Sequence, residues 1–140
     1  MTNKLVKACV IGWPAKHSLS PFIHHHWVMR YDLRGVYDIR EIAPEDLRGS
    51  VRKLVDEGYA GFNVTIPHKQ AIMDLCNEID EAAQKIGAVN TVRISADGKL
   101  YGMNTDSFGF AENLRCAGVS EKVKGASVLV LGAGGAARGI

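Results

Sequence analysis

Two ionisable side chains, Lys69 and Asp106, stand where strands are predicted to give way to helices, a position suited to acid–base chemistry on a small molecule. Residues 61–66 alternate polar and apolar side chains, as strands do, and Pro67 is predicted to begin a helix. Lys69 then falls in the first turn, where the helix dipole disfavours a cation and makes the amine a better proton acceptor. The alternative is a lysine that lies along the solvated surface.

Asp106 follows the strand predicted over residues 100–104 and begins the helix predicted over 106–117. Because acidic residues often cap helix starts, a capping role is the alternative to a catalytic one. Asn90 lies within a predicted strand, residues 88–94, where asparagine is uncommon. The alternative to a ligand contact is a hydrogen bond at a turn or a sheet edge.

Two hydroxyls precede a third predicted helix start. Ser18 and Ser20 are two residues apart in an extended loop, so both side chains can point the same way, and Pro21 is predicted to begin the helix. Paired hydroxyls at a helix entrance suit a carboxylate ligand. The alternative is that Ser20 only caps the helix.

A glycine-rich segment, residues 132–137, matches the pattern G-x-G-x-x-[G/A], and the apolar residues 127–131 before it predict a buried strand. In dinucleotide-binding proteins the first glycine permits a tight turn, the second lets a pyrophosphate approach the backbone, and the last small residue packs the helix against the strand. The alternative is a small-residue turn used for packing. The residue that distinguishes NAD from NADP lies about 20 positions further on in such a fold, beyond Ile140.

Three consecutive histidines, at positions 24–26, raise the question of a metal site. Successive helical residues point about 100° apart, so the three imidazoles cannot converge on one ion, and we expect no metal. The histidines at positions 17 and 68 flank the polar loops and are predicted to help shape the site. The three cysteines, at positions 9, 76 and 116, are far apart and form no C-x-x-C pair, which fits a reducing compartment.

Strand and helix signals alternate along the first hundred residues. Residues 95–98 form a turn that joins the last two strands of this region into a hairpin. The predicted strands cover residues 6–11, 35–42, 61–66, 88–94 and 100–104. The predicted helices run from Pro21 to about Tyr31, from Pro44 to Gly58, from Pro67 towards Gly87 with a break allowed near Asn77, and over residues 106–117.

This alternation predicts the α/β class, a mainly parallel sheet flanked by helices on both faces, with the hairpin adding one antiparallel neighbour. We assign residues 1–105 to this domain and 106–120 to a linker helix. Residues 121–140 would be the first strand, the glycine-rich loop and the helix start of a Rossmann domain. Because a lone strand and one helical turn cannot bury their own surfaces, we expect the chain to be a fragment of a longer protein.

Composition excludes several classes of protein. The 140 residues carry 17 Lys+Arg against 15 Asp+Glu, a net charge of +2, and 46% are hydrophobic, values typical of a globular protein rather than a disordered or fibrous one. Basic residues are scattered among acidic ones, so no nucleic-acid partner is expected. The start of the chain does not resemble a signal peptide, and the sequence has no apolar stretch of about 20 residues, so we expect a cytoplasmic protein with no membrane partner.

Five motifs in this order resemble those of the shikimate dehydrogenase family, at residues 17–21, 63–69, 87–91, 102–106 and 132–136. The resemblance covers essentially the whole chain and about the first half of a family enzyme. It implies a substrate-binding domain followed by a Rossmann domain, with the active site in the cleft between them. It also implies the NADP-dependent, reversible reduction of 3-dehydroshikimate to shikimate in aromatic amino-acid biosynthesis.

The same resemblance implies roles for individual residues. By this resemblance, Lys69 and Asp106 are expected to be the catalytic pair, and Ser18 and Ser20 are expected to bind the substrate carboxylate. The ring hydroxyls are bound by Thr65, Lys69, Asn90 and Asp106, and the cofactor, NADP rather than NAD, is bound by Gly132, Ala133, Gly134, Gly135 and Ala136.

Two other functions stay open, a quinate or quinate/shikimate dehydrogenase that uses NAD or NADP, and a shikimate-binding module without catalysis. The small hydroxyls of Ser18 and Ser20 favour shikimate over quinate. The partner is a small molecule, and the protein is expected to be a monomer or a homodimer. Because the adenosine-phosphate site and the nicotinamide pocket of the family have no counterpart in these 140 residues, we expect the isolated chain to have negligible turnover.

Overall fold

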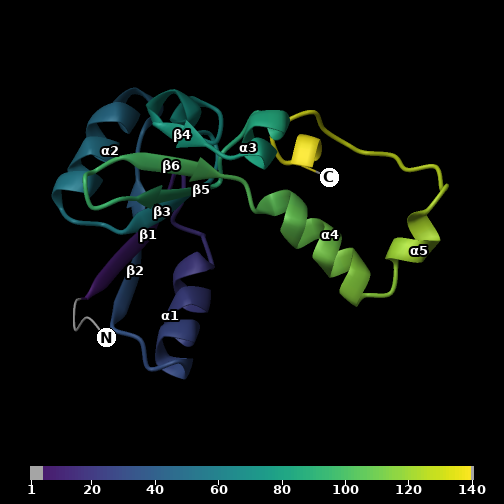
Figure 1. Cartoon of the computed structure of the whole chain (residues 1–140), viewed down its shortest axis with the longest axis horizontal. Coiled ribbons are helices and arrows are strands. Elements are labelled where there is room, and N and C mark those ends of the chain that lie inside the picture. Colours follow the sequence, from purple (N-terminus) through teal and green to yellow (C-terminus); the bar gives the residue numbers. More distant parts are fainter. Residues whose placement is uncertain (1–4, 140) are drawn as a thin grey trace.

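Residues 5–139 are described by a computed structural model, in which a twisted sheet with helices around it precedes an extended C-terminal segment (Figure 1). The strands are β1 (Val6–Gly12), β2 (Gly35–Glu41), β3 (Gly61–Val64), β4 (Glu78–Ile79), β5 (Thr91–Ile94) and β6 (Leu100–Met103). The α-helices are α1 (Ser20–Arg30), α2 (Leu47–Asp56), α3 (Glu81–Ile86), α4 (Asp106–Cys116) and α5 (Ser120–Val123), and the 3-10 helices are η1 (Pro44–Asp46), η2 (Ala71–Leu75) and η3 (Ala137–Gly139).

The six strands lie in the order β2-β1-β3-β5-β6-β4. β1 is parallel to both β2 and β3, β4 is parallel to β6, and β5 is antiparallel to both of its neighbours. The predicted fold class, a mainly parallel sheet with one antiparallel strand from a hairpin, is confirmed. Because of these directions, the carboxyl ends of β1, β3 and β6 and the start of β5 lie at the same end of the sheet, that is, along the line of strand ends.

The two faces of the sheet differ in what covers them. Successive side chains of a strand point to opposite faces. On one face Cys9 and Ile11 of β1 join the main hydrophobic core, which includes Val51 and Leu54 of α2. On the other face α1 packs against β1 and β2, and the register places Tyr37 of β2 beside Ala8. Tyr37 and Asn63, which belong to the polar cluster described below, lie on this second face.

Most predicted elements form close to their predicted limits. α2 buries Leu47, Val51 and Leu54, as its helical spacing predicts. The first turn of the helix predicted from Pro44 is the separate 3-10 helix η1. The hairpin of β5 and β6 pairs Thr91 with Met103. The helix predicted over 106–117 is α4, although none of its residues is buried. Within residues 5–139, no helix has the length and apolar character needed to span a bilayer.

The α-helix predicted from Pro67 towards Gly87 forms only in its last part, as α3, which Gly87 ends with φ +69°. The part before Asn77 was wrong. Residues 66–70 form a turn, the 3-10 helix η2 follows, and the chain becomes extended at Cys76. Ile72 is fully buried in the core, but Ile79 belongs to β4, which pairs with β6. The apolar spacing suited a continuous helix, but pairing with a strand more than twenty residues away determines the conformation.

The strand predicted over residues 127–131 does not form either. The segment is extended and unpaired, and Val128, Leu129 and Leu131 are each more than two-thirds exposed. A strand is stabilised by hydrogen bonds to a neighbour, and no described strand lies beside this one. The helix predicted after the glycines is only the 3-10 turn η3.

Two glycine-to-alanine substitutions are expected to change stability in opposite directions. A methyl group on Gly61 would lie 2.5 Å from the carbonyl oxygen of Val92 in the neighbouring strand, so Gly61→Ala should lower the free energy of unfolding by about 1–3 kcal/mol. Gly49, in α2, has no neighbour within 4 Å of such a methyl, so Gly49→Ala should raise it by about 0.5–1 kcal/mol. Urea unfolding of both variants checks the pair, and a loss of stability at Gly49 would contradict this packing.

Candidate active site

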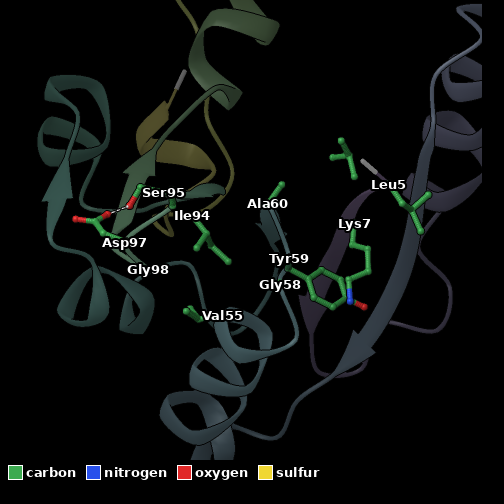
Figure 2. A pocket seen from close by; sticks show the side chains of 12 residues that line it. Leu5, Lys7, Val55, Gly58, Tyr59, Ala60, Ile94, Ser95, Asp97 and Gly98 are labelled. Atoms are coloured by element: carbon green, nitrogen blue, oxygen red, sulfur yellow. Dashed lines mark hydrogen bonds between the residues drawn. The ribbon is translucent and has the colours of Figure 1, made fainter. Parts of the chain in front are cut away.

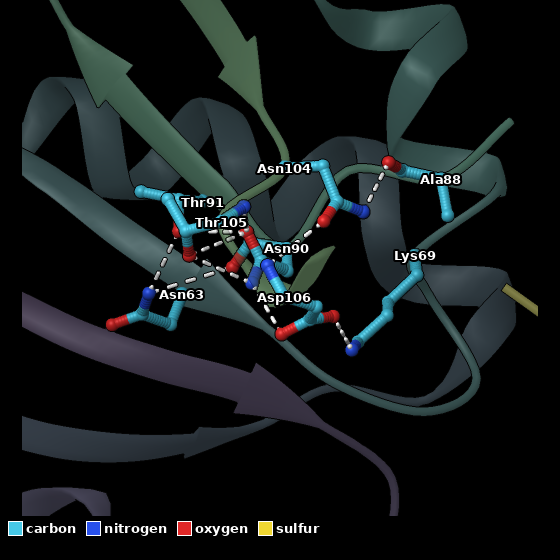
Figure 3. A network of polar contacts seen from close by, with 8 residues as sticks. All are labelled: Asn63, Lys69, Ala88, Asn90, Thr91, Asn104, Thr105 and Asp106. Atoms are coloured by element: carbon cyan, nitrogen blue, oxygen red, sulfur yellow. Dashed lines mark hydrogen bonds and ion pairs between the residues drawn. The ribbon is translucent and has the colours of Figure 1, made fainter. Parts of the chain in front are cut away.

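Lys69 and Asp106 meet at the end of the sheet where β1, β3 and β6 finish. The ammonium of Lys69 lies 2.7 Å from the carboxylate of Asp106, and their side chains are 22% and 38% exposed (Figure 3). Lys69 lies in the turn after β3, and Asp106 is the first residue of α4. The pair therefore joins segments 37 residues apart in the sequence, and it leaves both groups accessible to a ligand.

The predicted reason for a reactive Lys69 was wrong, because no α-helix begins at Pro67 and the dipole argument does not apply to a turn. Hydrogen bonds fix the position of Lys69 instead. Its carbonyl oxygen accepts from the N–H of Val89 at 2.8 Å. The neighbouring His68, 1% exposed, hydrogen-bonds through Nε2 to the carbonyl oxygen of Ile42 at 2.7 Å. His68 thus shapes the site by anchoring the turn that carries Lys69.

Asn90 is buried and connects the start of β5 with the start of α4. Its amide nitrogen donates to the second carboxylate oxygen of Asp106 at 2.6 Å and to the hydroxyl of Thr105 at 3.0 Å. Its amide oxygen accepts from the backbone N–H of Thr105 at 3.0 Å. Asn104, also buried, accepts from the N–H of Asp106 at 2.9 Å and donates to the carbonyl of Ala88 (Figure 3). These amides orient the carboxylate that faces Lys69.

Ser18 and Ser20 are close to each other at the entrance to α1. Their hydroxyls are 3.1 Å apart, and both residues are partly exposed. The alternative that Ser20 caps the helix was wrong, because Ser20 is the first helical residue and the N-cap is Leu19, which makes no side-chain cap bond. Instead the Ser18 hydroxyl accepts from the backbone N–H of Ser20 at 3.2 Å.

The loop that carries these serines is attached to the end of β2. The backbone N–H of Ala15 donates to Glu41 Oε1 at 3.1 Å, and the ammonium of Lys16 lies 3.4 Å from the same carboxylate. The Ala15 hydrogen bond, followed by that of Lys16, holds the pKa of Glu41 below its usual value. Trp13 also donates its N–H to the carbonyl of Ile66, so the loops after β1 and β3 are side by side.

Thr65 lies directly after β3, where its N–H donates to the carbonyl of Ile11 at 2.9 Å. Asn63 precedes it on the same strand and was not predicted as a site residue. Its amide nitrogen donates to the hydroxyl of Thr91 at 3.1 Å, and its amide oxygen accepts from the hydroxyl of Tyr37 at 2.7 Å. The alternation of Asn63 and Thr65 on one strand face was the available signal for Asn63, whereas nothing local indicated Tyr37 or Thr91.

The histidine run does not gather around one point. His24 Nδ1 bonds to the carbonyl of Ser20, and its ring stacks on that of Tyr37, while His25 and His26 are exposed. Within the described part of the chain, no group of three or more histidine, cysteine or acidic side chains could hold a metal ion.

The glycine-rich loop lacks the strand and the α-helix that were predicted on either side of it. Gly132 has φ +127°, a backbone conformation that residues with a side chain rarely adopt. At Gly134 no atom lies within 4 Å of the position that a Cβ would occupy. Gly135 approaches Ala88, and Arg138 lies near Gly87, so the segment returns towards α3 (Figure 1). The loop therefore offers accessible backbone close to the residues before β5.

A hollow of about 570 Å³ lies at the opposite end of the strands, beside the start of β1 and the end of β5 (Figure 2). Lys7, Tyr59 and Ser95 are among its lining residues, and none of the predicted site residues lines it. Hydrogen bonds from Ser95 and Lys99 lower the pKa of Asp97 there to about 2. This carboxylate is thus held by its own turn, and the hollow is separate from the polar cluster.

Comparison with known proteins agrees with this geometry. A family model for the shikimate dehydrogenase substrate binding domain matches residues 10–92. The shikimate dehydrogenase (NADP(+)) of Paramagnetospirillum magneticum is 44% identical over 140 residues, which cover all of this chain and 51% of that protein. The chain spans about half the length of the curated relatives it matches.

Solved structures give the same result. The shikimate dehydrogenase of Aquifex aeolicus superposes with a TM-score of 0.91 at 40% identity, covering 100% of this chain and 52% of that one. The Thermus thermophilus enzyme in complex with NADP(H) and shikimate superposes with a TM-score of 0.89 at 38% identity, covering 97% of this chain and 50% of that one.

Proposed function

Because this chain belongs to the family of shikimate dehydrogenase substrate-binding domains, we propose that it supplies the substrate-binding and proton-transfer half of an NADP-dependent shikimate dehydrogenase. The reaction is the reversible reduction of 3-dehydroshikimate to shikimate. The observation that carries this proposal is the Lys69–Asp106 pair, whose charged atoms lie 2.7 Å apart at an accessible end of the sheet. The second carboxylate oxygen of Asp106 accepts a hydrogen bond from Asn90.

Lys69 carries the proton in this proposal. Reduction of a ketone adds a hydride to the carbonyl carbon and a proton to the oxygen, on which negative charge develops. The ammonium of Lys69 donates a hydrogen bond to that oxygen, stabilises the charge and then transfers the proton. In the oxidising direction the neutral amine removes the proton of the alcohol. No metal is required for these steps.

Asp106 and Asn90 hold the reacting geometry. One carboxylate oxygen of Asp106 pairs with Lys69 and the other accepts from Asn90, so the carboxylate is fixed at both oxygens. A fixed ion pair keeps Nζ where a ring oxygen can reach it, and fixed positions of this kind account for much of enzymatic rate enhancement. Asp106 is also well placed to accept from a ring hydroxyl, since its side chain is 38% exposed.

The remaining predicted residues divide between the two ends of the substrate. We assign the carboxylate to the hydroxyls of Ser18 and Ser20, which lie together at the start of α1. We assign the ring hydroxyls to Thr65, Lys69, Asn90 and Asp106, from the ends of β3 and β6 and the start of β5. A carboxylic acid with several ring hydroxyls is thereby recognised from opposite ends.

The glycine-rich loop is our proposed contact for the cofactor. The conformation of Gly132 and the open space beside Gly134 fit the close approach of a pyrophosphate, so residues 132–136 would hold that group of NADP. When bound, the nicotinamide supplies or accepts the hydride. We assign residues 1–105 to the substrate domain, 106–120 to a linker helix and 121–140 to the start of the Rossmann domain, and expect the 140 residues alone to bind shikimate without turnover.

We also propose that the protein is cytoplasmic and works as a monomer or a homodimer without nucleic-acid or membrane partners. The spacing of the three cysteines supports a reducing compartment, since Cys9, Cys76 and Cys116 are far apart in the sequence and form no C-x-x-C pair. Burial raises the pKa of Cys9 to about 12, so this thiol is a packing group rather than a reactive one.

The test is NADP⁺-dependent oxidation of shikimate by the longest polypeptide in which this chain occurs, with quinate and NAD⁺ as parallel reactants. We expect shikimate with NADP⁺ to give the highest kcat/KM, because the small Ser18–Ser20 site suits shikimate. Higher activity on quinate would assign the protein to a quinate dehydrogenase. Shikimate binding without turnover of either acid would identify a binding module and contradict the roles of Lys69 and Asp106.

A further inference from the structure

The rings of His24 in α1 and Tyr37 in β2 stack between the helix and the sheet. Their centroids are 3.8 Å apart with an interplanar angle of 10°, and Trp27 meets the edge of His24 at 5.2 Å. Tyr37 is 4% exposed, although it lies outside the main hydrophobic core. Nothing in the sequence indicates that two aromatic rings meet here, and the proposed proton transfer uses neither of them.

Tyr37 begins a series of hydrogen bonds that ends at the proposed catalytic carboxylate. Its hydroxyl donates to Asn63 Oδ1 at 2.7 Å, and Asn63 Nδ2 donates to Thr91 Oγ1 at 3.1 Å. The Thr91 hydroxyl donates to Asn90 Oδ1 at 2.9 Å, and Asn90 Nδ2 donates to Asp106 Oδ1 at 2.6 Å. Figure 3 shows the part of this series from Asn63 to Asp106.

Every donor in the series points in the same direction, from β2 towards α4. Hydrogen bonds in such a chain polarise one another, and each also fixes which end of the next side chain faces forward. Asn63 presents its oxygen to Tyr37 and its nitrogen to Thr91. Asn90 presents its nitrogen to Asp106, and the backbone N–H of Thr105 holds the Asn90 oxygen in the same orientation. Tyr37 is thus the first donor of a series whose last acceptor is Asp106.

Two further observations support a fixed role for the rings. Burial raises the pKa of Tyr37 well above its ordinary value, so the hydroxyl stays protonated and can donate. On the other side, His24 Nδ1 lies 2.9 Å from the carbonyl oxygen of Ser20, which only accepts, so Nδ1 carries the hydrogen. The stack therefore touches the Ser18–Ser20 site through His24 and the amide series through Tyr37.

We propose that Tyr37 and His24 are positioning residues that hold the carboxylate-binding hydroxyls and the Lys69–Asp106 pair in a fixed relation to each other. This inference rests on the proposed function, since it concerns the two ends of the same substrate. Tyr37 acts through Asn63 on the ring end. His24 acts through the Ser20 backbone on the carboxylate end. The relation between the two ends would then discriminate acids whose ring oxygens lie at the right distance from the carboxylate.

The first experiment measures the amide series without any substrate. Tyr37→Phe keeps the stacked ring and removes the donor, and Tyr31→Phe, at a 63% exposed position at the end of α1, is the matched control. In ¹H–¹⁵N spectra of the 140-residue chain, the side-chain NH₂ signals of both Asn63 and Asn90 should move in Tyr37→Phe and stay in place in Tyr31→Phe. A change confined to Asn63 would overturn the series.

The second experiment measures shikimate turnover by the longest polypeptide that contains the chain. Loss of one hydrogen bond predicts a roughly three- to tenfold lower kcat/KM for Tyr37→Phe and no change for Tyr31→Phe. In an Asn63→Ala background, Tyr37→Phe should lose most of its effect and keep only the part due to the hydrogen bond between Tyr37 and the Ser20 side chain, whereas a general structural role predicts the same loss in both backgrounds. His24→Phe keeps a ring but not the bond to Ser20, so it should raise KM more than it lowers kcat.

The outcomes separate the two proposals. An unsubstituted protein that does not oxidise shikimate contradicts the proposed function, and the NH₂ signals still decide whether the Tyr37 hydroxyl is linked to Asn90 through the amide series. An active protein in which Tyr37→Phe matches Tyr31→Phe in both experiments overturns the positioning role alone. Equal thermal unfolding midpoints of the two variants show that any difference is local.

Discussion

Replacing Lys69 with alanine should lower kcat for shikimate oxidation by about 10²- to 10⁴-fold, the usual contribution of a positioned acid–base group. In the proposed function, the substitution removes the group of the pair that gives a proton to the ketone oxygen, while the hydroxyls of Ser18 and Ser20 still hold the carboxylate. The KM for shikimate should therefore change much less than kcat. Steady-state kinetics in both directions measure the two constants separately.

Lys85→Ala is the matched control for Lys69→Ala. Lys85 is 74% exposed and pairs with Glu81 on the surface of α3, so its loss should leave kcat and KM unchanged. Added alkylamines provide a second check, because a small amine that enters the vacated space should restore part of the rate in Lys69→Ala. Unaltered kcat in Lys69→Ala would exclude Lys69 as the proton carrier.

Replacing Asp106 with asparagine should lower kcat by about 10- to 100-fold, a smaller effect because the amine itself remains. The amide has nearly the same shape but no charge, so Lys69 loses its ion pair and Asn90 loses a charged acceptor. Asp56→Asn, at an exposed position at the end of α2, is the control that changes the same charge elsewhere.

The two site substitutions should not be additive. Because Asp106 is proposed to act largely by holding Lys69, the double variant Lys69→Ala/Asp106→Asn should be about as slow as Lys69→Ala alone. A double variant slowed by the product of the two single effects would mean that Asp106 acts on the substrate independently of Lys69. Kinetics of the four proteins in one double-mutant cycle distinguish these results.

Elements with a local signal could be predicted from the sequence. The apolar run of β1, the spacing of Leu47, Val51 and Leu54 in α2, and the turn between β5 and β6 each specify their own structure. The segment after Pro67 could not be predicted in this way. Its spacing is helical, but β4 gains hydrogen bonds to β6, and this pairing depends on residues far along the chain.

The candidate site divides in the same manner. Lys69, Asn90 and Asp106 could be singled out because each residue type is unusual or suggestive at its position, and the structure brings them within hydrogen-bond distance. Tyr37 could not, because a tyrosine in a strand is ordinary and its hydroxyl bond to Asn63 depends on the order of the strands. The local reason given for Lys69 failed with the helix on which it relied.

The alternation of side chains along β1 bears on how such a domain can evolve. Cys9 and Ile11 face the core beneath α2, whereas Ala8 and Val10 lie in register with Tyr37 and Asn63 on the opposite face. Selection for thermal tolerance can therefore act on one set of residues and selection for a new acid substrate on the other. The residues that stabilise the core and the residues that lie beside the site can thus change independently, although both sets belong to β1.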